Sequence, residues 1–301
     1  MQSQQIKMTD GKFARTHDEL VKRWQEYFQS ILNCPEPTVT QDCSNSQTTT
    51  QLPVNMDLIS EAEVRKAVKQ LKNGKAAGVD NIQPELLKTA DSVIPYLTRV
   101  CNMVWQHEVT PVNWKNGIII PLPNKGDLTE CNNWRGITLL SVPGKVFARI
   151  LLNRMKDAVD QLLREQQAGF RPGRSCVDQI FALRQIIEKV TEGQRPVIVN
   201  FVDFRKAFDC VHRPALWKIL EQYGIPTKIA SIIQKLYEES SSDVKIDGDI
   251  SKWFNRCPTR LYPITVVVCN KDRLGTKKDH RKMRWWHHMV RRYTIVRLGL
   301  C

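Results

Sequence analysis

The fold of this chain is constrained most strongly by a short apolar run of residues that ends on an aspartate. Residues 197–202 read VIVNFV, a pattern typical of a buried strand, and Asp203 follows directly. A carboxylate at the end of an apolar strand is costly to desolvate unless it meets water, a cation or a polar partner. Asp203 is therefore a candidate Mg²⁺ ligand, since Mg²⁺ prefers carboxylate oxygens. The alternative is that Asp203 caps a turn and that Asp209 caps the next helix.

Helices and short strands follow one another in irregular order along the chain. Amphipathic spacing predicts helices over residues 16–33, 60–74, 84–106, 143–163, 175–190, 214–224 and 226–237. Capping pairs mark three of their starts, Thr16 with Glu19, Ser60 with Glu63 and Ser175 with Asp178. A strand is predicted at 118–123, and a hairpin turning at Asp247-Gly248. Because there is no regular βαβ alternation, the sequence favours the α+β class.

The positive charge of the chain is concentrated in its last residues. The net charge is +14, and residues 256–301, with twelve Lys/Arg and two Asp, carry +10 of it. A nucleic-acid function of residues 1–255 must therefore rest on particular side chains. No stretch approaches the ~20 apolar residues of a membrane span, and the N-terminus lacks a signal-peptide core. Nine cysteines without a C-x-x-C pair argue against zinc and disulfides, so we expect an intracellular protein, nuclear or cytoplasmic, with no membrane contact.

Several segments, in order and at similar spacings, carry a resemblance to a known family. These are LKNGKAAGVDNIQPELLK (71–88), WKNGIIIPLPNKGD (114–127), NNWRGITLLSVPGKVFARILLNRM (132–155), EQQAGFRPGRSCVDQI (165–180) and FVDFRKAFDCVHR (201–213). Together they resemble the reverse transcriptases of LINE-type (non-LTR) retrotransposons, close to the jockey group. The resemblance covers about residues 10–254. Several motifs in order are far more specific than any one of them.

The resemblance implies roles for residues around the strand and its following turn. Asp203 would be the first metal-binding aspartate of the palm and would hold Mg²⁺. Phe208 would lie against the sugar of the incoming nucleotide, although core packing is the common fate of such an aromatic side chain. Asp209 matches the family pattern as a structural residue.

The resemblance also implies basic contacts to nucleotide and template. Arg135 would contact the triphosphate, for which the fixed donor fork of guanidinium is suited. Lys125 would add a second basic contact to the nucleotide, or would be a solvated turn lysine. Arg171 and Arg174 would lie near the template, or would form a basic loop before the helix that Ser175 caps. The family usually has Arg-Pro where this chain has Arg135-Gly136, a change expected to loosen the loop.

The family's later catalytic motifs are not found in the sequence. Its polymerases continue into a Gly-Gln-Gly segment and a Tyr/Phe-Ala-Asp-Asp turn that supplies two more aspartates. The 301 residues contain neither, and no two aspartates are adjacent. One carboxylate cannot hold two divalent ions beside a triphosphate. We therefore expect a chain truncated before these motifs and inactive alone.

These observations lead to an expected architecture and function. The fold is expected to be α+β, an incomplete right-hand polymerase with a helical N-terminal arm and a Pro/Ser/Thr-rich linker (1–57). A truncated reverse transcriptase domain, with fingers and the start of the palm, would follow (58–255), then a basic tail outside the family (256–301). The expected function is RNA-directed DNA synthesis with an RNA template, a DNA primer and dNTP. The alternatives are a non-catalytic nucleic-acid-binding remnant and a transposon fossil without a function.

Overall fold

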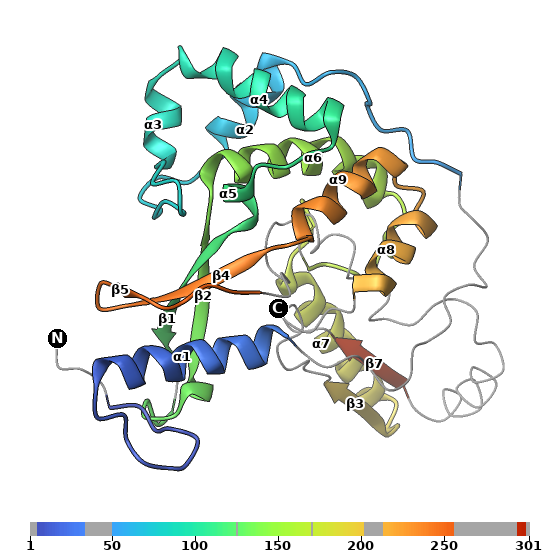
Figure 1. The fold of residues 1–301 in the computed structure, drawn as a ribbon. Helices are drawn as coiled ribbons and strands as arrows, with labels where there is room; N and C mark the ends of the chain where they lie inside the picture. Colours follow the sequence, from blue (N-terminus) through green and yellow to red (C-terminus); the bar gives the residue numbers. More distant parts are fainter. Residues whose placement is uncertain are drawn as a thin grey trace. The chain divides into compact units, whose positions relative to one another are not determined.

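The computed structural model of the chain describes residues 5–33, 50–124, 126–169, 171–201, 213–255 and 294–298 (Figure 1). The chain divides into two compact units. Among the described residues, the first unit holds 5–155 and 213–255, and the second holds 156–201 and 294–298.

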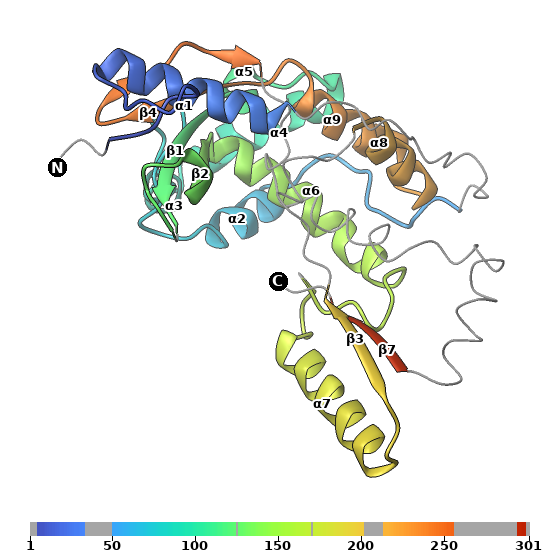
Figure 2. The same ribbon diagram turned by 90° about the horizontal axis from the view of Figure 1, so that it is seen from below.

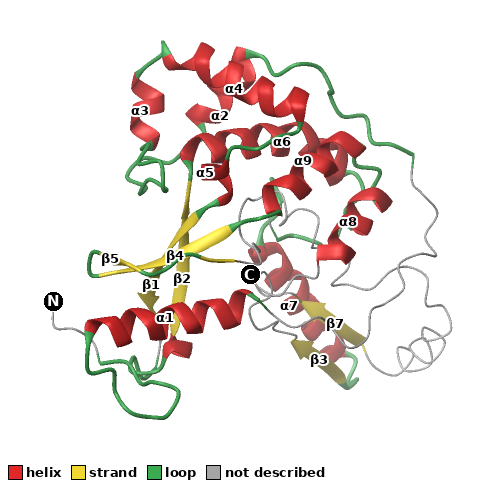
Figure 3. Cartoon of the chain, in the orientation of Figure 1, coloured by secondary structure: helices red, strands yellow, loops and turns green. Residues whose placement is uncertain are grey.

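Helices and one mixed sheet build the first unit (Figure 3). Its helices are α1 (His17–Leu32), α2 (Glu61–Lys69), α3 (Pro84–Thr89), α4 (Val93–His107), α5 (Val112–Lys115), α8 (Arg213–Gln222), α9 (Thr227–Tyr237) and the larger part of α6 (Val142–Asp160). Its strands are β1 (Gly117–Pro123), β2 (Trp134–Leu140), β4 (Ser241–Ile246), β5 (Asp249–Ile250) and β6 (Phe254–Asn255). None of the described helices combines the length and the apolarity needed to cross a bilayer.

Strand β1 lies at the centre of the sheet. It pairs antiparallel with β2 along its whole length, from Gly117 opposite Leu140 to Pro123 opposite Trp134. It pairs parallel with β4 only over its first three residues, so the proline-containing end is bonded on one side alone. This position suits Pro121 and Pro123, which have no N–H to offer a second neighbour.

The predicted hairpin after β4 is confirmed. Strands β4 and β5 pair antiparallel, with Ile246 opposite Asp249. Asp247 and Gly248 form the turn between them, both with positive φ, 49° and 104°. Positive φ at both central positions is what a two-residue turn needs to match the twist of its strands, and it explains the Asp-Gly sequence.

Helix α1 covers one face of this sheet (Figure 2). Leu20, Trp24, Tyr27 and Phe28 from the helix are buried with Ile119 of β1, Val244 of β4 and Phe254 of β6 in one apolar cluster. The ring of Trp24 meets that of Trp134 edge to face, with centroids 5.2 Å apart. Burial of these large side chains makes α1 part of the core around the sheet.

The predicted helix starts agree closely with the structure. The Ser60–Glu63 and Ser175–Asp178 capping boxes are both formed, with side chain and backbone bonded in both directions. At α1 the Thr16 hydroxyl accepts from the Glu19 N–H, but the Glu19 carboxylate accepts from the N–H of Arg15. The helix predicted to run to residue 74 ends earlier, at Lys69.

The single helix predicted over residues 84–106 is wrong. The chain forms α3 and α4 there, separated by residues 90–92. Pro95 explains the break. In a continuous helix its missing N–H would leave the carbonyl of Asp91 without a partner, whereas near the start of α4 no such bond is required.

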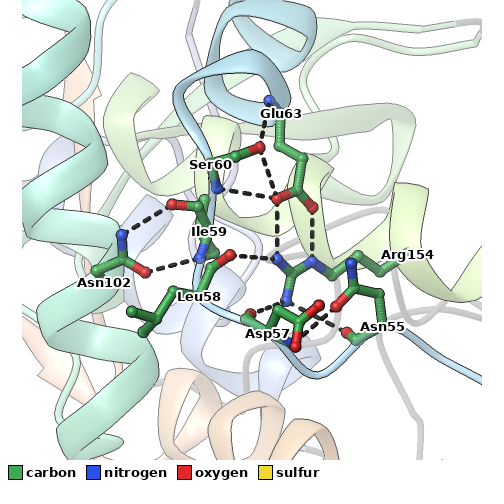
Figure 4. Close-up of polar contacts among 8 residues, drawn as sticks. All are labelled: Asn55, Asp57, Leu58, Ile59, Ser60, Glu63, Asn102 and Arg154. Atoms are coloured by element: carbon green, nitrogen blue, oxygen red, sulfur yellow. Dashed lines mark hydrogen bonds and ion pairs between the residues drawn. The ribbon is translucent and has the colours of Figure 1, made fainter.

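A guanidinium fastens the segment before α2 to helix α6 (Figure 4). Arg154 donates from Nε and Nη2 to the two carboxylate oxygens of Glu63, at 2.7 and 2.9 Å, and from Nη1 to the carbonyl of Asp57 at 2.9 Å. Its side chain is 3% exposed and its Cζ lies 4.9 Å from the ring centroid of Trp105. Asn102 of α4 holds the same segment by bonding both the N–H and the C=O of Ile59, each at 2.8 Å.

The second unit contains the end of α6, helix α7 (Cys176–Glu192) and strands β3 (Val197–Phe201) and β7 (Thr294–Leu298). The two strands pair parallel, with Val197 opposite Thr294 and Phe201 opposite Leu298. The predicted strand before Asp203 is therefore present as β3.

Candidate nucleotide- and template-binding site

The β1–β2 hairpin carries Arg135, the residue predicted to contact a triphosphate. Arg135 is the second residue of β2 and lies opposite Leu122 of β1. Its side chain is exposed, and its guanidinium has no hydrogen-bond or ion-pair partner among the described residues. A permanently charged donor fork without a protein partner is available to an anionic ligand.

The surroundings of Gly136, the next residue, show on which face of the sheet Arg135 lies. A Cβ atom at Gly136 would lie 2.5 Å from the ring of Phe28 and 3.0 Å from a methyl group of Ile119, so this position faces α1. Because successive strand residues point to opposite faces, Arg135 lies on the face away from α1. Leu122 and Ile137 share that face and are 40% and 43% exposed. The absence of a side chain at Gly136 makes room for the ring of Phe28.

The loop between the two strands, residues 124–133, is held by its own hydrogen bonds. The Asp127 side chain accepts from the N–H and the hydroxyl of Thr129, at 2.9 and 2.8 Å. Asn133 donates its side-chain amide to the Asp127 carbonyl, and Trp134 donates its indole N–H to the Leu128 carbonyl. We call residues 124–133 the tip loop. Lys125, the predicted second nucleotide contact, belongs to it but lies outside the described residues.

The other residues predicted near the nucleotide also lie outside the described residues. These are Asp203 and Phe208, together with Asp209. Strand β3 ends at Phe201, two residues before Asp203. Among the described residues no group of three His, Cys, Asp or Glu side chains is placed to hold a metal ion. A single carboxylate such as that of Asp203 offers at most two oxygens, an incomplete donor set for Mg²⁺.

Arg171 and Arg174, predicted near the template, differ in their surroundings. The Arg171 guanidinium donates to both carboxylate oxygens of Asp160, at 2.8 and 3.0 Å, and to the carbonyl of Arg164 at 2.7 Å. These bonds hold the pKa of the Asp160 carboxyl below its ordinary value. Arg174 is exposed and has no side-chain partner among the described residues. Within the described part of the chain, the guanidinium of Arg171 is bonded to protein groups and that of Arg174 is not.

A buried carboxylate in β4 had no signal in the sequence reading. Asp243 lies opposite Ile118 of β1, and is 2% exposed. Its Oδ1 has no hydrogen-bond partner among the described residues. Burial raises the pKa of Asp243 to about 6, with the positive charge of Lys245 opposing the shift. Alternation of polar and apolar residues in SSDVKI would place Asp243 on an exposed face, so no local pattern indicates its burial.

Comparison with known proteins gives one family match and several relatives. Residues 122–261 match the family described as reverse transcriptase (RNA-dependent DNA polymerase). The chain is 26% identical to the probable RNA-directed DNA polymerase from transposon BS of Drosophila melanogaster, over 73% of this chain and 25% of that protein. It is 24% identical to the RNA-directed DNA polymerase from mobile element jockey of the same species, over 81% and 27%. An uncharacterized 149 kDa protein of transposon TX1 from Xenopus laevis is 22% identical, over 80% and 19%.

The chain thus spans only about a fifth to a quarter of the length of these relatives. Proteins of the type-1 and type-2 elements R1DM and R2DM of Drosophila melanogaster match as well, at 28% and 24% identity. All these relatives come from transposons or retrotransposable elements, and the family match includes β2, β3 and β4. Residues 122–261 thus form a reverse transcriptase domain, and the chain is similar to the polymerases of LINE-type retrotransposons.

Proposed function

We propose that this chain supplies the fingers and the first catalytic aspartate of an RNA-directed DNA polymerase. The reaction is transfer of a nucleotide from dNTP to the 3′-hydroxyl of a DNA primer on an RNA template. The observation that carries the proposal is Arg135, an exposed guanidinium without a partner among the described residues, on a hairpin that packs against α1. Such a preorganised donor can bind triphosphate oxygens without reorganising its support.

The remaining roles are proposed from the same family relation. Asp203 would hold Mg²⁺, which when bound would neutralise charge on the triphosphate. Phe208 would pack against the sugar and Lys125 would add a phosphate contact. Arg174 is the better template contact of the two predicted arginines, since the guanidinium of Arg171 is already bonded to Asp160.

We further propose that the 301 residues do not catalyse synthesis by themselves. Asp203 would need further carboxylates to complete a site for two metal ions, and the sequence holds no pair of adjacent aspartates. The proposed limits, an arm and linker at 1–57, a polymerase part at 58–255 and a basic tail at 256–301, follow the extent of the family motifs. Fingers with the start of a palm, an incomplete right hand, is the architecture that this division implies.

Primer extension tests the catalytic part of the proposal. The full chain is incubated with a poly(A) template, an oligo(dT) primer, dTTP and Mg²⁺, beside its Asp203→Ala variant. No extension by either protein, with folding verified by circular dichroism, is the expected result. Extension that is lost in the Asp203→Ala variant would show that the chain is a complete enzyme and would refute the proposed inactivity.

A row of lysines favours a second candidate function, binding of nucleic acid without catalysis. Lys66 and Lys69 on α2, and Lys72 and Lys75 in the segment after it, are exposed and have no partner among the described residues. Their spacing of three residues concentrates positive charge on one part of the first unit. Binding of a single strand to these lysines would release counterions, so affinity would fall by about 0.7 in log K per contact for each tenfold rise in salt. Affinity that is insensitive to salt would argue against this function.

A further inference from the structure

The tip loop carries two carboxylates within eight residues, in sequence, of the proposed phosphate-binding arginine. Asp127 and Glu130 lie in the loop that joins β1 to β2, and Arg135 is the second residue of β2. Uncompensated, the two negative charges would oppose the approach of a phosphate group to this hairpin. With Lys125 as its own basic residue, the loop has a formal charge of −1, so one further positive charge beside the carboxylates would neutralise it.

Lys7 provides this charge from the other end of the sequence. Its Nζ lies 3.0 Å from Oε1 of Glu130 and 3.4 Å from Oδ2 of Asp127. The two hydrogen bonds raise the pKa of Lys7, that to Glu130 first, which keeps the ammonium charged at neutral pH. In the other direction, the Lys7 hydrogen bond contributes to the lowered pKa of Asp127, after the bonds from Thr129.

The backbone of Lys7 is fixed as firmly as its side chain. Its N–H donates to the carbonyl of Thr129 in the tip loop at 2.9 Å, and its carbonyl accepts from Nε of Arg23 on α1 at 3.0 Å. The preceding residue, Ile6, is 1% exposed and belongs to the apolar cluster beneath α1. Lys7 is thus held between α1 and the tip loop.

A small N-terminal hairpin gives Lys7 this position. Lys7 and Phe13 form a bridge, the N–H of Ala14 donates to the carbonyl of Ile6, and that of Met8 donates to the carbonyl of Lys12. We call residues 6–14 the N-terminal hairpin. Its turn at Gly11, with φ of 82°, points the chain back into α1.

We propose that Lys7 is a positioning residue of the phosphate-binding site. It neutralises the carboxylates of the tip loop and fixes the loop against α1, so that Arg135 presents a net positive charge to the phosphates of a nucleotide. The inference rests on the proposed function, in which Arg135 is the phosphate contact. It gives the N-terminal hairpin, more than one hundred residues away in sequence, a part in substrate binding.

The affinity of the full chain for inorganic tripolyphosphate, measured by calorimetry at low ionic strength, tests this role. We expect Lys7→Met to weaken binding about fivefold, the scale of one unit charge acting across several ångströms near a surface. Lys7→Arg keeps the charge and should bind within about twofold of the wild type. Lys22→Met, which removes an exposed lysine from α1, is the matched control and should leave affinity unchanged. All variants keep the basic tail, so phosphate bound there is common to them.

Glu130→Gln separates charge compensation from simple support of the fold. In the Lys7→Met background this change restores the net charge of the loop, so affinity should return to within about twofold of the wild type. A double variant as weak as Lys7→Met alone would overturn the proposal, because Lys7 would then act only by holding the loop. Thermal unfolding followed by tryptophan fluorescence verifies that each variant is folded.

Arg135→Ala distinguishes failure of this inference from failure of the proposed function. If Arg135→Ala weakens tripolyphosphate binding and Lys7→Met does not, the role of Lys7 is refuted and the phosphate site stands. If Arg135→Ala binds like the wild type, the proposed phosphate site itself is refuted. In 1 M salt, where the screening length is about 3 Å, the effect of Lys7→Met should disappear if it arises from charge.

Discussion

Asp243 should make the stability of this protein depend on pH in an unusual direction. Folding buries its carboxyl in β4, and burial raises its pKa from 3.8 to about 6. The folded chain then binds a proton more tightly than the unfolded chain. Stability from this group is present below about pH 4 and is lost as the pH rises through 6, the reverse of an aspartate in an ion pair.

The magnitude follows from the size of the shift. A rise of about two pKa units corresponds to about 3 kcal/mol of unfolding free energy between the protonated and ionised carboxyl. Asp243→Asn replaces the carboxyl by a neutral group of the same shape. Relative to the wild type, the variant should therefore gain about 3 kcal/mol between pH 4 and pH 8, added to any constant cost of burying the amide.

Urea unfolding followed by tryptophan fluorescence, at intervals from pH 4 to pH 8, measures this difference. Asp247→Asn is the matched control, since it makes the same substitution at an exposed carboxylate in the turn of the same hairpin. A flat difference for Asp243→Asn, or a variant that loses stability relative to the wild type as pH rises, would refute the argument from burial.

Three further predictions concern the first unit. Gly136→Ala places a methyl group 2.5 Å from the Phe28 ring and should cost about 1–3 kcal/mol in urea unfolding; Phe28→Leu in the same chain should recover part of that loss if the contact is the cause. Arg154→Met leaves Glu63 without its guanidinium and should lower the free energy of unfolding by about 3 kcal/mol, whereas Arg149→Met on the same helix should have little effect. A fragment limited to residues 58–255 lacks α1 and uncovers Ile119, so it should bind the dye ANS and unfold less cooperatively than the full chain; a cooperative fragment would show that α1 is dispensable.

Local signals in the sequence predicted much of the secondary structure. Ser60 with Glu63, and Ser175 with Asp178, marked helix starts because capping is decided by a few neighbouring residues. Asp247-Gly248 marked the hairpin because only certain residues accept positive φ. The break before α4 was also encoded locally, by Pro95, but helical spacing on both sides of it concealed the break.

Tertiary contacts were harder to predict from the sequence than helix starts and turns. Strand β2 was not predicted. Its pairing with β1 is a tertiary contact that the residues of β2 do not indicate by themselves. The ion pair of Arg171 with Asp160 joins residues eleven positions apart, and no local pattern distinguishes it from a template contact. Arg135 is exposed, and Asp203, Phe208 and Lys125 fall outside the described residues; the roles of all four stay predictions.

The contact between Gly136 and Phe28 has a consequence for the evolution of these elements. The ring of Phe28 occupies the space that a side chain at position 136 would need, and the two residues come from separate segments of the chain. A change at one position alone creates a clash or a cavity. We therefore expect the two positions to covary among related retrotransposons, with a smaller residue than phenylalanine in the N-terminal helix wherever proline follows the arginine. Covariation of these two positions would preserve the contact between α1 and the β1–β2 hairpin while the surrounding sequence diverges.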